Sequence, residues 1–181
     1  MTENHTESKT VQKPAFSRFA IIAGVIILFI VGSYLLKDGP LGPGEQAPLF
    51  NLPQANGTEG ILSMETLKGK PVLIDFWSTT CPPCLMQIPI LQRIQNEFPG
   101  IQVVGVAVGG ESLSRLKEFS KARSVTYPIV ADLRGVAAVP YNVTSLPTLF
   151  VVDANGVIVQ SHEGFWPEKQ LLDEVRKLIN P

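Results

Sequence analysis

Residues 71–98 constrain the fold more than any other part of the chain, because a buried-strand pattern there runs directly into a helical one. The stretch PVLIDFW (71–77) is an almost continuous apolar run, which is typical of a strand covered on both faces. Residues 82–98 carry apolar side chains at helical spacing, at Leu85, Ile88, Leu91, Ile94 and Phe98. Pro89 is expected to kink this helix. The junction predicts a strand–helix unit of an α/β fold.

The rest of the chain continues this alternation and then changes character. The stretch IQVVGVAV (101–108) predicts a second buried strand, and residues 112–123 have the spacing of an amphipathic helix. Residues 148–153 and 157–161 predict two antiparallel strands, because the tight-turn sequence ANG joins them. A last helix is expected from about Pro167. We therefore expect an α/β fold with a mixed central sheet and helices on both of its faces.

Residues 19–36, FAIIAGVIILFIVGSYLL, contain no charged side chain and lie between Arg18 and Lys37. A helix of this length rises about 27 Å, enough to cross the hydrocarbon core of a bilayer. A buried core helix would have a polar face, and a cleaved signal peptide would be followed by a small-x-small site. The sequence has neither, so we predict an uncleaved transmembrane signal-anchor helix. The positive-inside rule then leaves residues 1–18 in the cytoplasm as a polar tail and the rest of the chain outside it.

The stretch after this predicted helix has the composition of a linker. Residues 37–48, KDGPLGPGEQAP, hold three prolines and three glycines. We expect one globular domain over residues 45–181. The formal net charge of -1 predicts no large basic surface, so we expect no nucleic-acid partner.

The only two cysteines of the chain, Cys81 and Cys84, are separated by Pro82 and Pro83 at the predicted strand-to-helix junction. A disulfide between them closes a very short loop and stabilises little, so reactivity explains the pair better than structure does. The free N–H groups and the dipole at a helix start stabilise a thiolate, and prolines are tolerated there. We predict that Cys81 attacks a partner disulfide and that Cys84 resolves the mixed disulfide.

Asp75 is an acid inside the otherwise apolar strand that leads to the pair. Burial would raise its pKa towards the working pH and make it a candidate to accept the Cys84 proton. Two other interpretations stay open, a solvent-facing strand residue and an acid paired with a nearby lysine.

Two distant motifs resemble the TlpA-like (redoxin) family of membrane-anchored thiol–disulfide oxidoreductases in the thioredoxin superfamily. The first is VLIDFWSTTCPPCLMQIP, which resembles the active-site stretch of that family. The second is residues 141–156, which fit its pattern Y-x-V-x-x-x-P-T-x-F-x-x-D-x-x-G. The resemblance covers nearly all of residues 45–181 and implies a thioredoxin-like fold. It also implies a single-pass protein of the bacterial cytoplasmic membrane with a periplasmic catalytic domain.

The resemblance implies roles for further residues. In the family, the proline that corresponds to Pro147 is cis and lies against the cysteine pair, and the residue before it, here Leu146, offers backbone hydrogen bonds to the substrate. We expect Trp77, Pro82 and Pro83 to contribute to the same substrate-binding surface.

The chain departs from the family pattern at two positions close to the cysteine pair, residues 80 and 87. Thr80 stands where many relatives have a tryptophan, and Gln87 stands where many TlpA-like proteins have a buried glutamate. Asp75, by contrast, matches the buried aspartate of thioredoxin itself. The resemblance therefore implies that the proton-transferring acid sits at position 75 rather than 87.

The function that these features predict is a monomeric reductant of disulfides in exported proteins, serving cytochrome c maturation or metal-site assembly. No redox cofactor site is visible in the sequence, so we expect a membrane thiol reductase to supply the electrons.

Two alternatives stay open. One is a copper(I) or other metal carrier that uses the cysteines and Met86, although the helical position of Met86 favours packing and His162 is distant along the chain. The other is a thiol peroxidase, because peroxiredoxins share the core fold and have a hydroxyl residue three positions before the reactive cysteine, as Ser78 is here.

Overall fold

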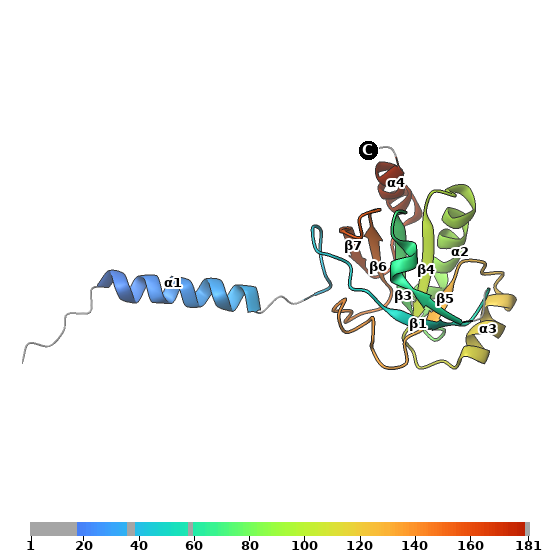
Figure 1. Ribbon diagram of the computed structural model, residues 1–181, viewed down its shortest axis with the longest axis horizontal. Helices are drawn as coiled ribbons and strands as arrows, with labels where there is room; N and C mark the ends of the chain where they lie inside the picture. Colours follow the sequence, from blue (N-terminus) through green and yellow to red (C-terminus); the bar gives the residue numbers. More distant parts are fainter. Residues whose placement is uncertain (1–17, 36–38, 58–59, 180–181) are drawn as a thin grey trace, which may run out of the picture. The chain divides into compact units, whose positions relative to one another are not determined.

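The computed structural model of the chain describes residues 18–35, 39–57 and 60–179. The chain divides into two compact units, residues 1–38 and residues 39–181 (Figure 1). The described part of the first unit is one helix, and the second unit is a sheet covered by helices and connecting segments.

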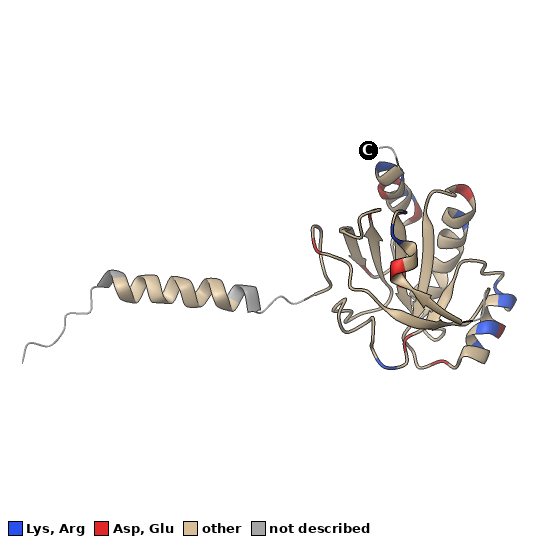
Figure 2. Cartoon of the chain, viewed as in Figure 1, with Lys and Arg blue, Asp and Glu red and all other residues tan. Residues whose placement is uncertain are grey.

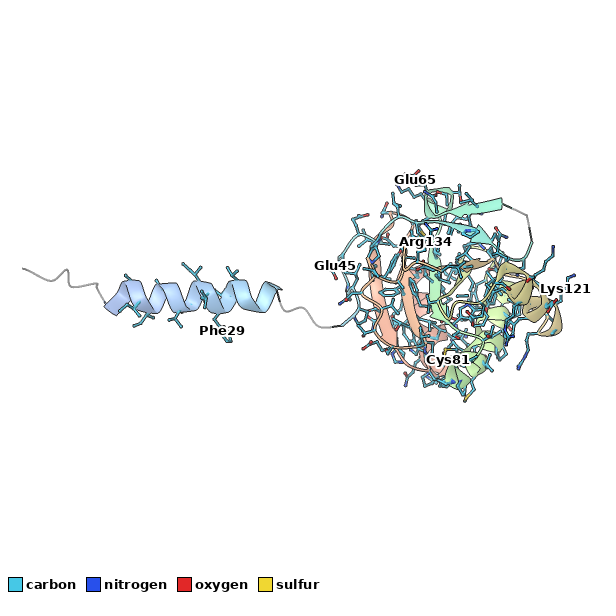
Figure 3. All side chains as sticks on the ribbon, turned by 90° about the horizontal axis from the view of Figure 1, so that it is seen from below. Phe29, Glu45, Glu65, Cys81, Lys121 and Arg134 are labelled. Atoms are coloured by element: carbon cyan, nitrogen blue, oxygen red, sulfur yellow. A yellow bond between two sulfur atoms is a disulfide. The ribbon has the colours of Figure 1, made fainter. Side chains whose placement is uncertain are left out.

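Helix α1 (Arg18–Leu35) is formed by the apolar run of the first unit. Its large apolar side chains are exposed, with Leu28 at 78% and Phe29, labelled in Figure 3, at 77% of full accessibility. Within the described ranges, the structure has no helix whose length and apolar character suffice to cross a membrane. Residues 1–17 of the expected tail, and residue 36 of the expected span, lie outside the described residues.

The second unit is built on a seven-stranded mixed sheet with the order β2-β1-β5-β4-β3-β6-β7. Strands β3, β4 and β5 are parallel, and the other neighbours are antiparallel. The strands are β1 (Asn51–Gln54), β2 (Gly60–Ser63), β3 (Val72–Trp77), β4 (Gln102–Ala107), β5 (Ile129–Ala131), β6 (Thr148–Val152) and β7 (Ile158–Glu163). The four strands predicted from the sequence are confirmed, as is the antiparallel pairing of the last two.

The three α-helices of this unit are α2 (Pro82–Glu97), α3 (Leu113–Ala122) and α4 (Glu168–Ile179), close to their predicted bounds. A short 3-10 helix, η1 (Met64–Leu67), precedes β3. Helix α2 continues through Pro89 as one element. Figure 2 shows both acidic and basic residues on these helices.

These three helices bury their apolar side chains on one face of the sheet, which corrects the expectation of helices on both faces. Leu91 of α2, Leu116 of α3 and Leu171 of α4 belong to the same core cluster. The cause is the strand order, since β3, β4 and β5 follow one another across the sheet in one direction. Two right-handed crossovers in the same direction leave α2 and α3 on the same face. The opposite face is covered by segments that include Phe50 and Tyr141.

Strand register brings distant segments to one edge of the sheet. Trp77 at the end of β3 lies opposite Ala107 at the end of β4, which lies opposite Ala131 at the end of β5. Strand β6 runs antiparallel to β3, so its first residue, Thr148, pairs with Phe76 at that same edge. The segments that follow β3, β4 and β5 therefore meet the segment that precedes β6.

The connection from β5 to β6 leaves this edge and returns to it. The Asp132 carboxylate accepts hydrogen bonds from three consecutive N–H groups, those of residues 136–138, at 2.7, 2.9 and 2.8 Å. These bonds hold a compact turn, because they satisfy donors that no strand partner meets. The turn exposes apolar side chains, with Leu133 at 58% and Val139 at 75% of full accessibility.

Part of the Gly- and Pro-rich stretch before the sheet is attached to it. The Gly44 N–H donates to the carbonyl of Ile158 at 2.8 Å, and the Ala47 N–H donates to the carbonyl of Gly156 at 2.9 Å. Ala47 is buried. This stretch therefore lies along the hairpin of β6 and β7.

Strands β1, β2 and β5 were not predicted, because each is short and lacks a regular alternation of apolar and polar residues. Side-chain hydrogen bonds hold β1 next to β5. The Asn56 Oδ1 accepts from the N–H of Ile129 at 2.7 Å, and its Nδ2 donates to the carbonyl of Tyr127 at 3.0 Å. Contacts between such distant residues leave no local pattern in the sequence.

Candidate active site

The cysteine pair lies where β3 ends and α2 begins. Cys81 is the N-cap of α2 and has an extended backbone. A disulfide joins Cys81 to Cys84, whose Cα atoms are 5.3 Å apart. The Cys84 N–H donates to the Cys81 Sγ at 3.3 Å, so one of the free N–H groups of the helix start points at this sulfur. The predicted placement of the pair at a helix N-terminus is confirmed, and this end of the helix stabilises a thiolate at Cys81.

The two cysteines differ in accessibility. Cys84 has no exposed surface, whereas Cys81 is half-buried. Pro82 is exposed and Pro83 is half-buried beside it. Figure 3 places Cys81 near the outline of the second unit. A partner molecule can therefore reach Cys81, and Cys84 has to act from the interior.

Asp75 is fully buried in β3, between Gly105 of β4 and Leu149 of β6. Neither of its carboxyl oxygens has a hydrogen-bond partner among the described residues. Burial raises the pKa of Asp75 to about 8. Because strand residues alternate between faces, Asp75 lies on the same face as Trp77, which shares a core cluster with Cys84. The solvent-facing interpretation of Asp75 is wrong, and no lysine within the described ranges bonds to it.

Two aromatic rings fill the space beside Asp75 and depend on Gly105. A Cβ at Gly105 would lie 2.9 Å from the Trp77 Nε1 and 3.3 Å from the Tyr127 Cε2. Burial, and then the charge of Asp75, raise the pKa of Tyr127 well above its usual value, so this hydroxyl stays neutral. Trp77 is 1% exposed and packs on Phe119. The expectation that Trp77 binds substrate is therefore wrong, since its ring supports the site from inside.

Gln87 is also fully buried, but it is tied to another element. Its Oε1 accepts a hydrogen bond from the Trp166 N–H at 2.8 Å, which links α2 to the segment before α4. A carboxamide does not exchange a proton near neutral pH. Asp75 therefore remains the candidate for proton exchange with Cys84.

The peptide bond between Leu146 and Pro147 is cis, as the resemblance implied. Pro147 is buried and Leu146 is half-buried. Leu146 packs against the same core cluster as Cys81. The structure thus brings Leu146, Pro147, the two prolines of the motif and the cysteine pair to one edge of the sheet.

One group that the sequence did not reveal lies on the side of β4. Glu111 follows β4 and is 7% exposed. Its Oε1 accepts hydrogen bonds from the Ser78 Oγ at 3.0 Å, the Thr79 N–H at 2.7 Å and the Thr79 Oγ1 at 2.8 Å. Burial opposes ionisation, but these bonds outweigh it and hold the pKa of Glu111 below its usual value. An acid directly after two glycines at the end of a predicted strand was the available signal.

The other residues named for metal binding, Met86 and His162, lie in different surroundings. Met86 is 58% exposed, so its expected packing is wrong. His162 stacks on Trp166, with ring centroids 4.6 Å apart. In the part of the chain that the structure describes, no three His, Cys, Asp or Glu side chains are grouped so as to hold a metal ion.

The geometry agrees with comparisons to known proteins. Residues 43–161, which include both motifs, match the model of the AhpC/TSA family. The thiol-disulfide oxidoreductase ResA of Bacillus subtilis is 33% identical over 143 residues, which are 78% of each chain.

Solved structures superimpose on the second unit's fold. One is a thiol:disulfide interchange protein of the DsbE type from Chlorobium tepidum, with a TM-score of 0.70 and 28% identity over 76% of this chain and 98% of that one. Another is the exposed lipoprotein thioredoxin Etrx1 from Streptococcus pneumoniae, with a TM-score of 0.62 and 27% identity over 72% of this chain and all of that one.

Proposed function

Since the chain belongs to the AhpC/TSA family and is a thioredoxin-like thiol–disulfide oxidoreductase, we propose that it reduces disulfides in exported proteins. The observation that carries the proposal is the asymmetry of the pair. Cys81 is accessible at a helix start, and Cys84 is buried on the same face as an acid with a pKa of about 8. This arrangement suits a Cys81 sulfur that attacks the partner disulfide and a Cys84 sulfur that resolves the mixed disulfide.

The reaction proceeds in two displacement steps. The Cys81 thiolate attacks one sulfur of the partner disulfide, so a mixed disulfide forms and the other partner sulfur leaves as a thiolate. Cys84 then gives its proton to Asp75 and attacks the Cys81 sulfur. The Cys81–Cys84 disulfide forms, the second partner sulfur leaves, and two electrons have passed to the partner. Proton transfer is nearly balanced, because a free thiol has a pKa of about 8.5, close to that of Asp75.

The direction of electron flow is tested by the reduction potential of the pair in equilibrium with thiol buffers. A reductant fed from a membrane thiol reductase should have a value near that of thioredoxin, about -270 mV. A value near about -120 mV is that of an oxidant and would overturn the proposal.

We propose proteins of cytochrome c maturation or metal-site assembly as the substrates, on the strength of the TlpA-like motifs. Cys84→Ser keeps the attacking sulfur and removes the resolving one, so it should retain these substrates as mixed disulfides. Mass spectrometry of the trapped species identifies them. Recovery of cysteine proteins that belong to neither group would refute this choice of substrate.

We also propose that residues 19–36 anchor a monomeric, extracytoplasmic domain to the bacterial cytoplasmic membrane. The charge-free run and the exposed apolar side chains of α1 support this, as does the description of Etrx1 as an exposed lipoprotein. The test is fractionation: the chain should stay with membranes after an alkaline carbonate wash, and intact spheroplasts should leave residues 45–181 open to added protease. Release by the wash, or full protection from protease, would contradict it.

A further inference from the structure

The loop that presents Cys81 lies beside the loop that follows β4. Both leave the carboxyl ends of neighbouring parallel strands, and the Val108 N–H donates to the carbonyl of Trp77 at 3.0 Å. Glu111 reaches across from the second loop to the first and accepts three hydrogen bonds from Ser78 and Thr79. One carboxylate oxygen thus holds the two residues that directly follow β3.

The hydrogen bonds continue from Ser78 to the cysteine. The Ser78 Oγ is 3.0 Å from the Thr80 Oγ1 and accepts from the Thr80 N–H at 3.2 Å. The Cys81 N–H donates to the Ser78 carbonyl at 3.3 Å. Through Ser78, Glu111 therefore fixes each residue of the loop up to the reactive cysteine.

The backbone at Gly109 lies close to the Glu111 carboxylate. A Cβ at Gly109 would lie 2.7 Å from the Glu111 Oε1 and 2.8 Å from its Oε2, and it would also clash with the Ser78 Oγ. Glycine at this position lets the main chain approach the acid closely. Glu111 is 7% exposed, so bulk water screens its charge poorly.

The position of the charge matters for the cysteine. The carboxylate accepts a hydrogen bond from the Thr79 N–H, and two residues of chain span at most about 7 Å, so the Cys81 sulfur lies at most roughly 14 Å from it. At an effective dielectric constant of about 20, a unit charge at that distance changes a pKa by about one unit. Its sign opposes the helix N-terminus, which favours the Cys81 thiolate.

We propose that Glu111 is a positioning residue that fixes the loop before Cys81 and that its negative charge makes the cysteine pair more reducing. A negative charge near the attacking sulfur disfavours the thiolate and thereby the reduced pair, which lowers the reduction potential. The inference rests on the thiol–disulfide chemistry of the pair and not on the direction of electron flow. An oxidising wild type would therefore refute the proposed function without deciding the role of Glu111.

The test compares full-length variants in detergent by equilibration with dithiothreitol redox buffers. Glu111→Gln keeps the shape of the side chain and removes the charge. We expect the equilibrium constant to change about tenfold towards the reduced pair, which corresponds to a potential about 30 mV less negative. We also expect the Cys81 thiol pKa, followed by thiolate absorbance, to fall by about one unit.

Two matched variants separate charge from structure. Glu118→Gln removes an exposed acid from α3, and Thr79→Val removes one hydrogen bond to Glu111 but leaves its charge. Both should keep the wild-type potential, even if Thr79→Val unfolds more easily. If Glu111→Gln does not fold, Glu111→Ala replaces it in the same assay.

Three outcomes would overturn the proposal. The first is a charge-removing variant of Glu111 with the wild-type potential and Cys81 pKa. The second is an equal shift in Glu118→Gln, which would mean that net charge alone acts. The third is an equal shift in Thr79→Val, which would mean that loop geometry rather than charge sets the potential.

Discussion

Asp75 should make the stability of this protein depend on pH in a way that Asp75→Asn abolishes. In the folded chain the pKa of this carboxyl is about 8, whereas its usual value is 3.8. Between about pH 4 and pH 8, Asp75 therefore keeps its proton in the folded state but has lost it in the unfolded state. The contribution of protonated Asp75 to the free energy of unfolding is fully present below about pH 4 and is lost as the pH rises through about 8.

The magnitude follows from the size of the interval. One proton bound in the folded state alone gives a slope of about -1.4 kcal/mol in the free energy of unfolding per pH unit. Between about pH 4 and pH 7 the wild type should lose roughly 4 kcal/mol through Asp75. That is a large share of the roughly 5–15 kcal/mol by which a domain is stable. The asparagine variant has no such proton and should lose none of it.

Urea unfolding of the oxidised chain at several pH values between about 5 and 7 measures this effect. The difference in unfolding free energy between wild type and Asp75→Asn should change by about 1.4 kcal/mol per pH unit, with equal m-values. Glu118→Gln, which removes an exposed acid, is the control and should follow the wild type. A difference between wild type and Asp75→Asn that stays constant with pH would refute the buried, protonated Asp75.

Three further outcomes test the site. Asp75→Asn should slow resolution of a mixed disulfide by roughly 100-fold, the usual contribution of a general base, and Gln87→Ala should slow it far less. Stopped-flow fluorescence measures both rates, and similar rates would exclude Asp75 as proton acceptor. In the wild type this rate should rise as the pH approaches about 8, because only ionised Asp75 accepts a proton; a flat profile would contradict this. Gly105→Ala should cost about 1–3 kcal/mol by urea unfolding, because its Cβ would lie 2.9 Å from a buried indole nitrogen. Gly100→Ala is its control, because a Cβ there would meet no atom within 4 Å. An equal loss of stability in both variants would mean that the close contact at Gly105 is not its cause.

The core of the fold was predictable because its strands and helices have strong local patterns. Strand β3 is fully buried and apolar except for Asp75, and α2, α3 and α4 each have an apolar stripe. The side of the sheet that each helix covers was not predictable, since it depends on the order of strands. That order includes β5, a strand of three residues with no pattern of its own.

The site residues that could be predicted are those that can be recognised from their neighbours in the sequence. Cys81 and Cys84 follow from their spacing, and Asp75 follows from its apolar neighbours. Trp77 was expected in the substrate-binding surface, but strand alternation places it on the sheet face whose core cluster holds Cys84. Glu111 was missed because its partners lie 32 and 33 residues away and meet it only through parallel register.

The connection between β5 and β6 joins an exposed turn to the segment that contains the cis Leu146–Pro147 bond. It begins and ends at the edge where the sulfurs lie, and the Asp132 carboxylate holds its first turn by three hydrogen bonds. Leu133 and Val139 are exposed in this turn, so the core should tolerate substitutions there. Changes in the exposed turn should therefore leave the cysteine pair undisturbed, whereas changes at Leu146, which packs against the core cluster of Cys84, should not.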